Sequence, residues 1–459
     1  MPRVAIIGGG PAGYEAALVA AQLNAEVTLV ESTGAGGACV LTDCVPSKTF
    51  IATSNAVTEI DEAGDLGVES PRPTVNAKAV NARVQHLASQ QSSDIAGKLT
   101  TAGVNLVHGK ASLFGAEGHR HLVEVKPHEG DAYSFSADVV LLATGATPRV
   151  LPSTPIDGER IITCRELYEL DELPEHLIVV GSGVTGAEFA SAYLATGSRV
   201  TLISSRDRVM PHEDRDAAEA IESVFRDRGM DIRSHARANG VRRTDSGVEV
   251  ELSDGTLING SHALITVGSV PNSEGLGLES VGVALNERGH VPVDKVSRTN
   301  VPGIYAAGDL TGVHALASVA AMQGRIAVWH ALGEAVRPIK LRNVASNVFS
   351  DPELATVGVT QGDVDNGKVD CRVVKVPLSS NPRAKMLNRS RGFVKLFVWR
   401  ASGIVAGGVV VASRAGELIH PVAIAVEQRL TVEQYARTLT IYPSVSGSFA
   451  EAARQLMEY

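Results

Sequence analysis

Two cysteines separated by four residues could form a redox centre near the start of the chain. Cys39 and Cys44 lie in the segment Gly-Gly-Ala-Cys-Val-Leu-Thr-Asp-Cys-Val-Pro-Ser-Lys, which ends at Lys48. Four intervening residues place both thiols on roughly one face of a helix, with allowance for a distorted turn. The thiolate is the reactive form of such a pair. We therefore expect redox chemistry here, and we interpret the outlying Cys164 and Cys371 as structural thiols.

Composition and charge exclude several classes of protein. The 459 residues exceed what one core can hold, so two to four domains are expected. The net charge is −9 and no long Lys/Arg block is present, so no nucleic-acid partner is expected. No apolar run reaches the roughly 18 residues that span a bilayer, and no second Cys or His pair stands at metal-ligand spacing. The chain starts almost directly in a strand, and four cysteines are few, which together favour a cytoplasmic location.

A strand, a glycine turn, a helix and a second strand open the chain. The strand Val4–Ile7 precedes a Gly-x-Gly-x-x-Gly turn, and the strand Val27–Val30 ends in Glu31. The turn positions are Gly8, Gly10, Pro11, Ala12 and Gly13. Glycines there let the backbone approach a pyrophosphate at the helix N-terminus, and Glu31 can accept hydrogen bonds from a ribose. The pattern predicts dinucleotide binding, and the alternative is a tight turn without a ligand.

A second copy of the pattern begins at the strand Leu177–Val180. Its glycines are Gly181, Gly183 and Gly186. The following strand, Arg199–Ile203, ends in Ser204 instead of the acid that would bond the ribose 2′-hydroxyl of NAD. Serine with Arg206 and Arg208 close by suits a 2′-phosphate, so NADPH is favoured over NADH. A solvated loop is the other interpretation of the two arginines.

The cysteine segment resembles the redox-active helix of the flavoprotein disulfide reductases, the family of dihydrolipoamide dehydrogenase, glutathione reductase and mercuric reductase. Their usual form is Gly-Gly-Thr-Cys-x4-Cys-x-Pro-Ser-Lys, and only Ala38 departs from its core. The resemblance runs from Val4 to about Met457. It implies an α/β fold with two Rossmann-like dinucleotide-binding domains, a C-terminal α+β dimerisation domain, FAD and NAD(P)H as cofactors, and a homodimer.

The resemblance also implies domain boundaries. The expected domains are an FAD-binding domain in two parts (1–147 and 269–341), an NAD(P)-binding domain (148–268) and a dimerisation domain (342–459). The segment Val139–Gly145 resembles the exit from the FAD domain, Val267–Asn272 the return into it, and Val301–Asp309 the second FAD motif, which is followed by a helix over Leu316–Leu332. In the last domain, strands are predicted over Gly392–Arg400 and Ile404–Ala412, and helices over Arg414–Arg429 and Thr431–Leu439.

Residue roles follow from the same motifs. Cys44 corresponds to the flavin-side thiol and Cys39 to the interchange thiol, while Lys48 would place its ammonium near the flavin and pair with Glu188 close to N5. The implied FAD contacts are Gly8, Gly10, Pro11, Ala12, Gly13, Glu31, Gly37, Lys48, Thr144, Gly145, Gly308, Asp309 and Ala317. The implied NADP contacts are Gly181, Gly183, Val184, Gly186, Ser204, Arg206, Arg208 and Gly268. Asp309 corresponds to the aspartate that holds the ribityl chain.

The far end of the chain departs from the family. Where the family has a His-Pro pair followed by an orienting Glu, this sequence has Tyr442-Pro443 and then Gly447. A tyrosine with a reference pKa of about 10 is a poor base at neutral pH. Loss of a general acid–base typically costs about 10² to 10⁴ in rate, so dithiol exchange should be slow. His420 could replace the base, but it lies on a predicted helix and is interpreted as an ordinary histidine.

These departures resemble an actinobacterial branch of the family that acts as NAD(P)H:quinone reductase and lacks the C-terminal His-Glu pair. Quinones need no dithiol exchange, and the Tyr442 hydroxyl could donate a hydrogen bond to a quinone oxygen. Val184, where the family often has an aromatic residue, indicates a more open site. We therefore expect hydride transfer from NADPH, or NADH, through flavin to quinone-type acceptors. The alternatives are a disulfide reductase that uses Cys39 and Cys44, and a flavin-loaded sensor, against which the second nucleotide fold argues.

Overall fold

The computed structural model describes residues 1–457, and their contacts group the chain into two compact units. The first unit comprises residues 1–49, 81–149 and 268–339. The second comprises residues 50–80, 150–267 and the chain from 340 onward. Residues 50–80 thus group with the second unit, although they lie within the first part of the FAD-binding domain expected from the sequence. The domain boundaries expected near 148, 269 and 342 stay predictions.

The first unit is built on a seven-stranded sheet. Its strand order is β17-β6-β1-β2-β3-β4-β5, in which β17, β6, β1, β2 and β3 pair in parallel and β4 and β5 extend the sheet antiparallel. The strands are β1 (Arg3–Ile7), β2 (Glu26–Glu31), β3 (Asn105–Glu117), β4 (Arg120–Pro127), β5 (Tyr133–Ala137), β6 (Val139–Leu142) and β17 (Ile304–Ala306), with a separate pair β7 (Ala146–Pro148) and β16 (Ser269–Pro271). The strands predicted at Val4–Ile7 and Val27–Val30 are confirmed as β1 and β2.

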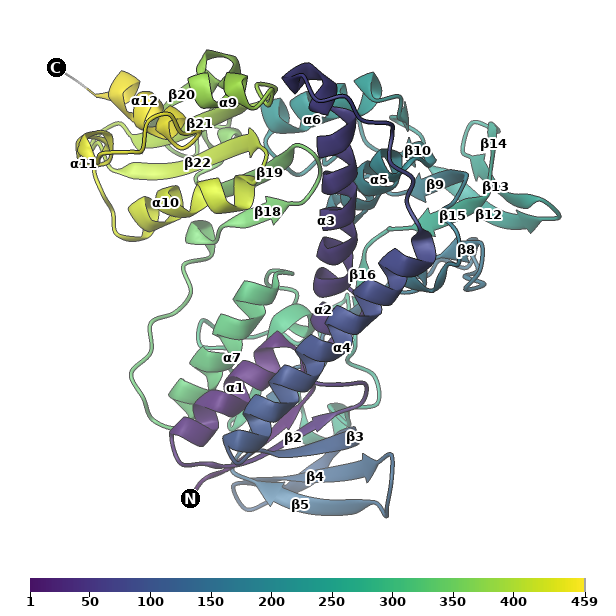
Figure 1. Ribbon diagram of the computed structural model, residues 1–459. Coiled ribbons are helices and arrows are strands. Elements are labelled where there is room, and N and C mark those ends of the chain that lie inside the picture. Colours follow the sequence, from purple (N-terminus) through teal and green to yellow (C-terminus); the bar gives the residue numbers. More distant parts are fainter. Residues whose placement is uncertain (458–459) are drawn as a thin grey trace. The chain divides into compact units, whose positions relative to one another are not determined.

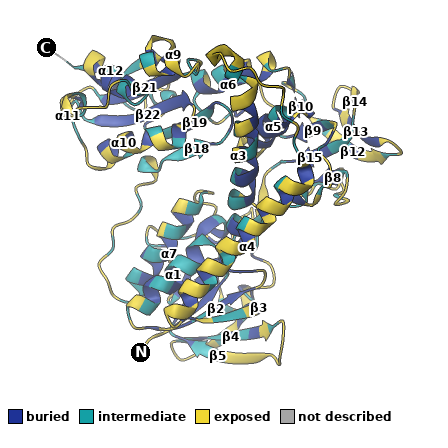
Figure 2. Cartoon of the chain, viewed as in Figure 1, coloured by how far each residue is buried: buried dark blue, intermediate teal, exposed yellow. Residues whose placement is uncertain are grey.

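Small residues let two helices of the first unit pack closely. Helix α1 (Pro11–Gln22) follows the first glycine turn, and α7 (Ala317–Ala331) is the helix predicted over Leu316–Leu332. They lie side by side in Figure 1 and make extensive contact. A Cβ at Gly324 would lie 2.1 Å from the Ala12 carbonyl oxygen, so this crossing requires glycine. The unit also contains α2 (Gly37–Leu41), the 3₁₀ turn η4 (Gly308–Thr311) and most of the long, largely exposed α4 (Ala77–Thr101) (Figure 2).

The second unit repeats the parallel nucleotide-fold pattern on a five-stranded sheet. The strand order is β11-β10-β9-β15-β8, and the pairings are parallel. The elements are β8 (Ile161–Ile162), β9 (His176–Val180), α5 (Val184–Thr196), β10 (Arg199–Ile203), α6 (Arg215–Asp227), β11 (Asp231–Arg233) and β15 (His262–Ile265), with an antiparallel three-stranded sheet of β12 (Ala238–Thr244), β13 (Gly247–Leu252) and β14 (Leu257–Gly260).

A third large sheet, called here the C-terminal sheet, completes the second unit. Its strand order is β18-β19-β22-β21-β20. The elements are β18 (Ser346–Val348), β19 (Glu353–Gly358), α8 (Gln361–Asp365), β20 (Cys371–Pro377), α9 (Pro382–Met386), β21 (Phe393–Trp399), β22 (Val405–Ala412), α10 (Ala415–Glu427), α11 (Val432–Arg437) and α12 (Gly447–Leu456). Val394, Leu396 and Val398 of β21 share a core with Ile419 of α10 and Phe449 of α12, so both helices cover one face of this sheet.

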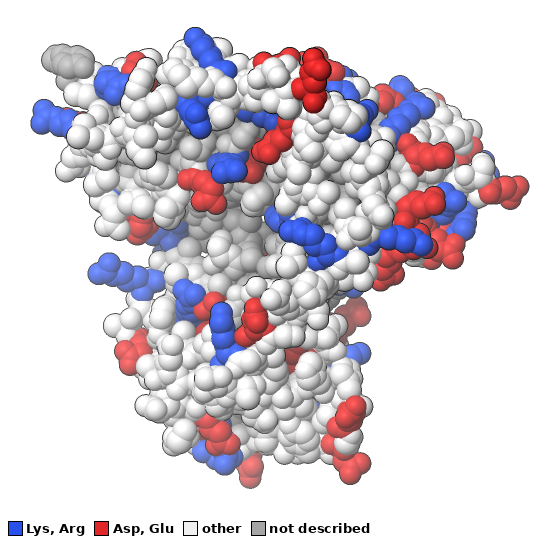
Figure 3. Space-filling model, in the orientation of Figure 1, with Lys and Arg blue, Asp and Glu red and all other residues white. Residues whose placement is uncertain are grey.

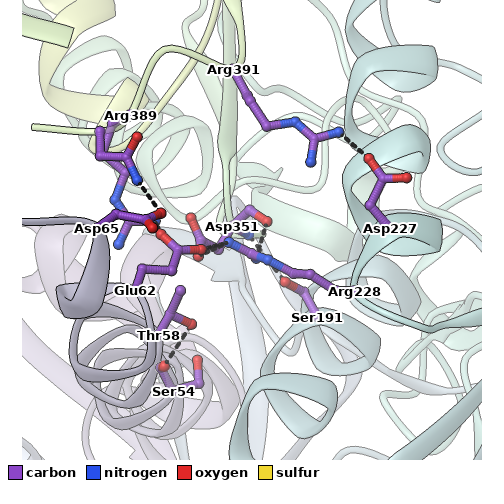
Figure 4. A network of polar contacts seen from close by, with 11 residues as sticks. Ser54, Thr58, Glu62, Asp65, Ser191, Asp227, Arg228, Asp351, Arg389 and Arg391 are labelled. Carbon is purple, nitrogen blue, oxygen red and sulfur yellow. Dashed lines mark hydrogen bonds and ion pairs between the residues drawn. The ribbon is translucent and has the colours of Figure 1, made fainter. Parts of the chain in front are cut away.

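An ion-pair network joins four segments of the second unit (Figure 4). Glu62 follows helix α3 (Cys44–Asp61), and its carboxylate accepts hydrogen bonds from Arg389 and, at 2.9 Å, from Arg228. Arg228, the C-cap residue of α6, also donates to the Asp351 carboxylate at 3.0 Å. Arg391 pairs with Asp227 at the same end of α6. The C-terminal end of α6 is therefore fixed to the segments that flank the C-terminal sheet.

Residues 1–457 contain neither a membrane-spanning helix nor a cluster of metal ligands. None of their helices is long and apolar enough to cross a membrane. No group of three or more His, Cys, Asp and Glu side chains among them could hold a metal ion.

Candidate active site

The first glycine turn is shaped by close backbone contacts. Gly8 has φ 104°, and a Cβ there would lie 2.3 Å from the Ala143 carbonyl oxygen. A Cβ at Gly13 would lie 1.9 Å from the Gly8 carbonyl oxygen, so neither position accepts a side chain. A Cβ at Gly10, by contrast, would have no heavy atom within 4 Å beyond its chain neighbours. The turn therefore leaves open space at the start of α1, where the helix dipole favours a phosphate.

Glu31, at the end of β2, is positioned beside this turn. One carboxylate oxygen accepts the Gly9 N–H at 2.6 Å, and the other accepts the Thr33 N–H at 2.7 Å. The residue is buried, with 6% exposure. The first oxygen has a further lone pair, whereas the second also accepts from the Thr33 hydroxyl and the Gly34 N–H. Glu31 can therefore still accept a hydrogen bond from a ribose hydroxyl through the first oxygen.

The two redox cysteines lie on two helices, which corrects the expectation of one distorted helical turn. Helix α2 ends at Leu41, and Cys44 is the first residue of α3. The thiol of Cys44 donates a hydrogen bond to Cys39, which lowers the pKa of Cys39 despite the opposing effect of burial. The same hydrogen bond, together with burial, raises the pKa of Cys44. Cys39 is therefore the thiol that ionises first, and its role as the interchange thiol stays a prediction.

Two acids with raised pKa values, Asp43 and the half-buried Asp309, accompany the thiols in the first unit. Burial raises the pKa of Asp43, with Lys48 acting in the opposite direction. Burial, reinforced by Asp43, also raises the pKa of Asp309, and His290 opposes this shift. Within residues 1–457 the Asp309 carboxylate makes no hydrogen bond or ion pair. It is therefore suited to accept hydrogen bonds from the hydroxyl groups of a ligand. Asp43 is not among the predicted site residues, although an acid between two redox cysteines is a visible signal in the sequence.

Further predicted flavin-site residues lie where the chain leaves and re-enters the first unit. The Thr144 hydroxyl donates to the Asn272 carbonyl at 2.7 Å, and the Asn272 side-chain amide donates to the Thr144 carbonyl at 2.8 Å. Gly145 has φ 67°. The Gly308 N–H donates to the buried Gln323 side chain at 2.9 Å. Asn272 and Gln323 hold these turns in place, and neither was predicted as a site residue.

Two more of the predicted FAD residues lie at helix starts. Gly37 begins α2 with φ 58°, and a Cβ there would approach the Gly10 Cα to 2.9 Å. The cysteine-bearing segment therefore packs directly on the first glycine turn. Ala317 begins α7, which follows η4 with its Gly308 and Asp309 along the chain.

The second glycine turn, in the second unit, reproduces the constraints of the first. A Cβ at Gly181 would lie 2.4 Å from the Thr266 carbonyl oxygen, and one at Gly186 would lie 2.0 Å from the Gly181 carbonyl oxygen. Gly183 again faces open space. Val184 begins α5 and is 40% exposed. The geometry is that of a second dinucleotide turn.

Residues 204–213, called here the coenzyme loop, connect β10 to α6. The Ser204 hydroxyl is buried and bonds the Ser182 hydroxyl at 2.7 Å and the Arg208 carbonyl at 3.0 Å. Ser204 thus holds the loop together, and its direct contact with coenzyme stays a prediction. The guanidinium of Arg208 donates to Asp207 at 2.7 Å and to the Pro211 carbonyl at 3.2 Å. The exposed Arg206 guanidinium makes no hydrogen bond or ion pair within the described chain.

Three other predicted residues lie apart from these turns. Gly268 groups with the first unit, where its carbonyl accepts the Arg149 N–H at 2.9 Å. Glu188 is buried on α5, and its carboxylate accepts the Phe349 N–H at 2.9 Å within the second unit. Tyr442 is 85% exposed. The pairing of Glu188 with Lys48 stays a prediction, as does the role of Tyr442 in a partner's site.

The glycine turns, the paired thiols and the C-terminal sheet agree with what comparison with known proteins finds. The chain matches the pyridine nucleotide-disulphide oxidoreductase family over residues 2–324 and the dimerisation domain of that family over residues 344–453. The protein therefore belongs to the pyridine nucleotide-disulphide oxidoreductases. It is a flavoprotein oxidoreductase with FAD and NAD(P)H as cofactors, as expected from the sequence.

Individual relatives cover the whole chain. An NAD(P)H dehydrogenase (quinone) of Mycobacterium tuberculosis strain H37Rv is 53% identical over 464 residues, which is 100% of this chain and 94% of the relative. The dihydrolipoyl dehydrogenase of Bacillus subtilis strain 168 is 32% identical over 98% of this chain and 95% of the relative. The crystal structure of LpdA from Mycobacterium tuberculosis matches with a TM-score of 0.96 at 53% identity, covering 100% of both chains.

The residues of the first unit fit FAD. The open space at Gly10 accommodates a pyrophosphate, and the remaining lone pair on the Glu31 oxygen that accepts from Gly9 accommodates a ribose hydroxyl. The Asp309 carboxylate, with its raised pKa and no partner among the described residues, suits the hydroxyl groups of the ribityl chain. The fit thus rests on one feature from each of three elements: the open space in the glycine turn, the carboxylate at the end of β2 and the carboxylate in η4.

Gly10→Ala should separate folding from flavin binding. Gly10 has φ −66° and faces open space, so the apoprotein should tolerate a methyl group. A bound pyrophosphate approaches the backbone at this glycine, so FAD affinity should fall by about tenfold or more. The ratio of absorbance at 450 and 280 nm measures flavin content, and Gly97→Ala, also in open space, is the matched control. Full flavin content in Gly10→Ala would contradict this placement of the pyrophosphate.

Cys44→Ala should raise the pKa of Cys39, because it removes the thiol that donates to the Cys39 sulfur. Cys44→Ser retains a donor and is the matched control. The measurement is the pH dependence of alkylation at Cys39 in the reduced holoenzyme, followed by peptide mass spectrometry. The alkylation midpoint should move to higher pH in Cys44→Ala and less so in Cys44→Ser. An unchanged midpoint in both variants would show that the hydrogen bond does not set the acidity of Cys39.

Proposed function

We propose that this protein is an NADPH-dependent reductase of quinone-type acceptors. The observation that carries the proposal is the far end of the chain. Tyr442 and Gly447 stand where the family pattern has its histidine and glutamate. Gly447 has no side chain, and it begins helix α12 with its N–H donating to the Ser444 hydroxyl. A thiol pair without its usual base is poorly suited to rapid disulfide exchange.

The named relatives support this choice of acceptor. The mycobacterial relative at 53% identity is an NAD(P)H dehydrogenase (quinone), and the dihydrolipoyl dehydrogenase of Bacillus subtilis is at 32%. His420, the other candidate base, is exposed on α10 and has Pro421 next to it. His420 therefore does not replace the family's histidine as a general base.

The proposed roles of the chain's own residues follow from their positions. FAD, when bound, supplies the hydride chemistry between NADPH and the acceptor. Glu31 and Asp309 hold the ribose and ribityl hydroxyls, and Lys48 provides a positive charge beside Cys44 and Asp43. The Tyr442 hydroxyl, on an exposed segment, donates a hydrogen bond to a quinone oxygen. Cys39 and Cys44 shape the flavin site and are not required for quinone turnover.

Arg206 is the proposed ligand of the coenzyme 2′-phosphate. Arg208 is occupied by Asp207 and the Pro211 carbonyl, whereas Arg206 is exposed and uncommitted among the described residues. A guanidinium binds phosphate through charge-assisted hydrogen bonds that NADH cannot form. This difference supports a preference for NADPH.

The proposed assembly is a homodimer. Three apolar side chains lie on one short exposed segment, with exposures of 97% for Leu439, 82% for Ile441 and 85% for Tyr442. Apolar side chains gathered in this way mark an interaction site, and the segment belongs to the family's dimerisation domain. Acidic and basic side chains intersperse on the face shown in Figure 3, in line with the proposal of a small-molecule acceptor and no nucleic acid. A cytoplasmic location stays a prediction.

A disulfide reductase is the second candidate function. The low pKa of Cys39, caused by the hydrogen bond from Cys44, favours its thiolate without a histidine. This pair could therefore exchange with a disulfide substrate at a reduced rate. The two candidates differ in whether turnover needs Cys39.

Steady-state NADPH oxidation with different acceptors should distinguish these functions. A benzoquinone and a naphthoquinone should be reduced rapidly by the wild type and by Cys39→Ser, because neither acceptor exchanges with a thiol. Lipoamide and glutathione disulfide should turn over at least about 10² times more slowly, as expected without a general acid–base. Efficient disulfide turnover that is lost in Cys39→Ser would instead establish the second candidate.

Arg206→Ala should raise the KM for NADPH by about 10- to 100-fold, the range for losing a hydrogen bond to a charged group. The KM for NADH should change by less than about twofold, since NADH lacks the 2′-phosphate. Arg242→Ala, an exposed arginine on β12 of the same unit, is the control and should change neither value. If both coenzymes weaken equally in Arg206→Ala, the arginine does not read the phosphate.

A further inference from the structure

A buried lysine connects the C-terminal sheet to the start of α6. Lys395 lies on β21, an inner strand, and its side chain is 2% exposed. Its ammonium donates to both carboxylate oxygens of Asp214, at 3.0 and 2.8 Å, and lies 2.9 Å from the Asp216 carboxylate. Burial of an unpaired ammonium would be strongly unfavourable, so this lysine and these acids require one another.

Lys395 points away from the core that α10 and α12 cover. Its neighbours Val394 and Leu396 belong to that core, and side chains alternate between the faces of a strand. On the Lys395 face, Lys375 of β20 lies 3.2 Å from the Asp216 carboxylate, and both lysines lie over the Phe393 ring. Burial raises the pKa of Asp216, but hydrogen bonds from the two lysines more than offset this and lower it overall. The first turn of α6 is thus bound to this face by two acids and two lysines.

Asp214 has a second function as the N-cap of α6. Its carboxylate accepts the Ala217 N–H at 3.2 Å, which satisfies one free donor of the first turn. The ion pair with Lys395 therefore fixes the position at which α6 begins. That position is also the end of the coenzyme loop, because Asp214 follows residue 213 directly.

The coenzyme loop is held at several points along its length. Ser204 bonds Ser182 at its beginning. In its middle the Val209 N–H donates to Glu222 at 3.0 Å and the Met210 N–H donates to the Ser182 carbonyl at 2.8 Å. Lys395 and Asp214 hold its end. Glu222 lies on α6, so a shift of α6 would displace Val209 and, with it, the arginine-bearing half of the loop.

We infer that Lys395 is a positioning residue for NADPH selectivity: through Asp214 it fixes the start of α6 and so holds Arg206 where a 2′-phosphate would bind. The inference rests on the proposed NADPH preference and adds a residue of the C-terminal sheet to its determinants. A lysine that served stability alone would affect both coenzymes equally. A lysine that positions the coenzyme loop affects mainly the binding of NADPH, which carries the 2′-phosphate.

Lys395→Met tests this inference in the full-length holoenzyme, because methionine keeps most of the length and removes the charge. The dissociation constants of NADP⁺ and NAD⁺ are measured by calorimetry, and KM and kcat for NADPH and NADH are measured with a benzoquinone. NADP⁺ binding and the KM for NADPH should weaken on the order of tenfold, as for one weakened charge-assisted hydrogen bond. The values for NAD⁺ and NADH should change by less than about twofold.

Two further variants keep the test decisive. Asp214→Asn/Lys395→Met removes the unpaired buried carboxylate and retains an N-cap, since asparagine caps as well as aspartate. It should fold even if the single variant does not, and it should show the same selective loss. Arg228→Met breaks ion pairs at the opposite end of α6 (Figure 4) and is the matched control. It should lower the unfolding temperature without changing the ratio of NADP⁺ to NAD⁺ affinity.

The outcomes separate this inference from the proposed function. Unchanged NADP⁺ affinity in both Lys395 variants, equal weakening of the two coenzymes, or the same selective loss in Arg228→Met would each overturn the positioning role. If any one of these outcomes occurs while the wild type prefers NADP⁺ and Arg206→Ala abolishes that preference, only the positioning role of Lys395 fails. If the wild type binds both coenzymes equally, the proposed NADPH preference fails and the inference fails with it.

Discussion

Both nucleotide sites depend on a steric constraint between a strand end and the first turn of the following helix. In each turn the third glycine lies against the carbonyl of the first, so that a Cβ at Gly13 or Gly186 would lie far inside van der Waals contact with that oxygen, at 1.9 and 2.0 Å. This contact sets the direction in which α1 and α5 leave their sheets. It also leaves the middle glycine facing open space, where a phosphate can approach the backbone.

The thiol pair shows how local geometry can partly replace a missing base. Because α2 ends before Cys44, the two sulfurs lie on separate helices, and Cys44 can donate a hydrogen bond to Cys39. That bond favours a thiolate at Cys39, but it provides no group that moves a proton to and from a substrate. A low pKa at Cys39 does not by itself supply a group that transfers protons to a disulfide substrate. An intact cysteine motif is therefore compatible with the proposed quinone chemistry.

The parts of the molecule that can be predicted from the sequence are those where the backbone conformation or a close contact permits only one or a few residue types. Gly8, Gly13, Gly181 and Gly186 adopt conformations or contacts that exclude any side chain, so their pattern identified both turns. The break between Cys39 and Cys44 was less visible, because spacing alone does not distinguish one helix from two. Ser204 was interpreted as a phosphate ligand, and only the structure shows its hydroxyl turned into the loop.

Lys395 illustrates a residue that sequence reasoning could not find. A single lysine within an apolar strand suggests a solvent-facing position, and its partners Asp214 and Asp216 lie about 180 residues earlier, at a helix start that resembles any other. Asn272 and Gln323 were missed for a similar reason, because their amides bond to backbone groups distant in sequence. Long-range polar pairs have no local signature.

The attachment of α6 at both ends has a consequence for the dynamics of the second unit. Its N-terminus is held by Lys395 and its C-terminus by Arg228, so fraying from either end requires breaking a partly or fully buried ion pair. Helix ends usually open locally and exchange their amide hydrogens quickly, while central residues exchange only on larger openings. In α6 the hydrogen-bonded amides near both ends should therefore exchange nearly as slowly as the middle ones, which makes the helix a single cooperative element rather than one with mobile ends.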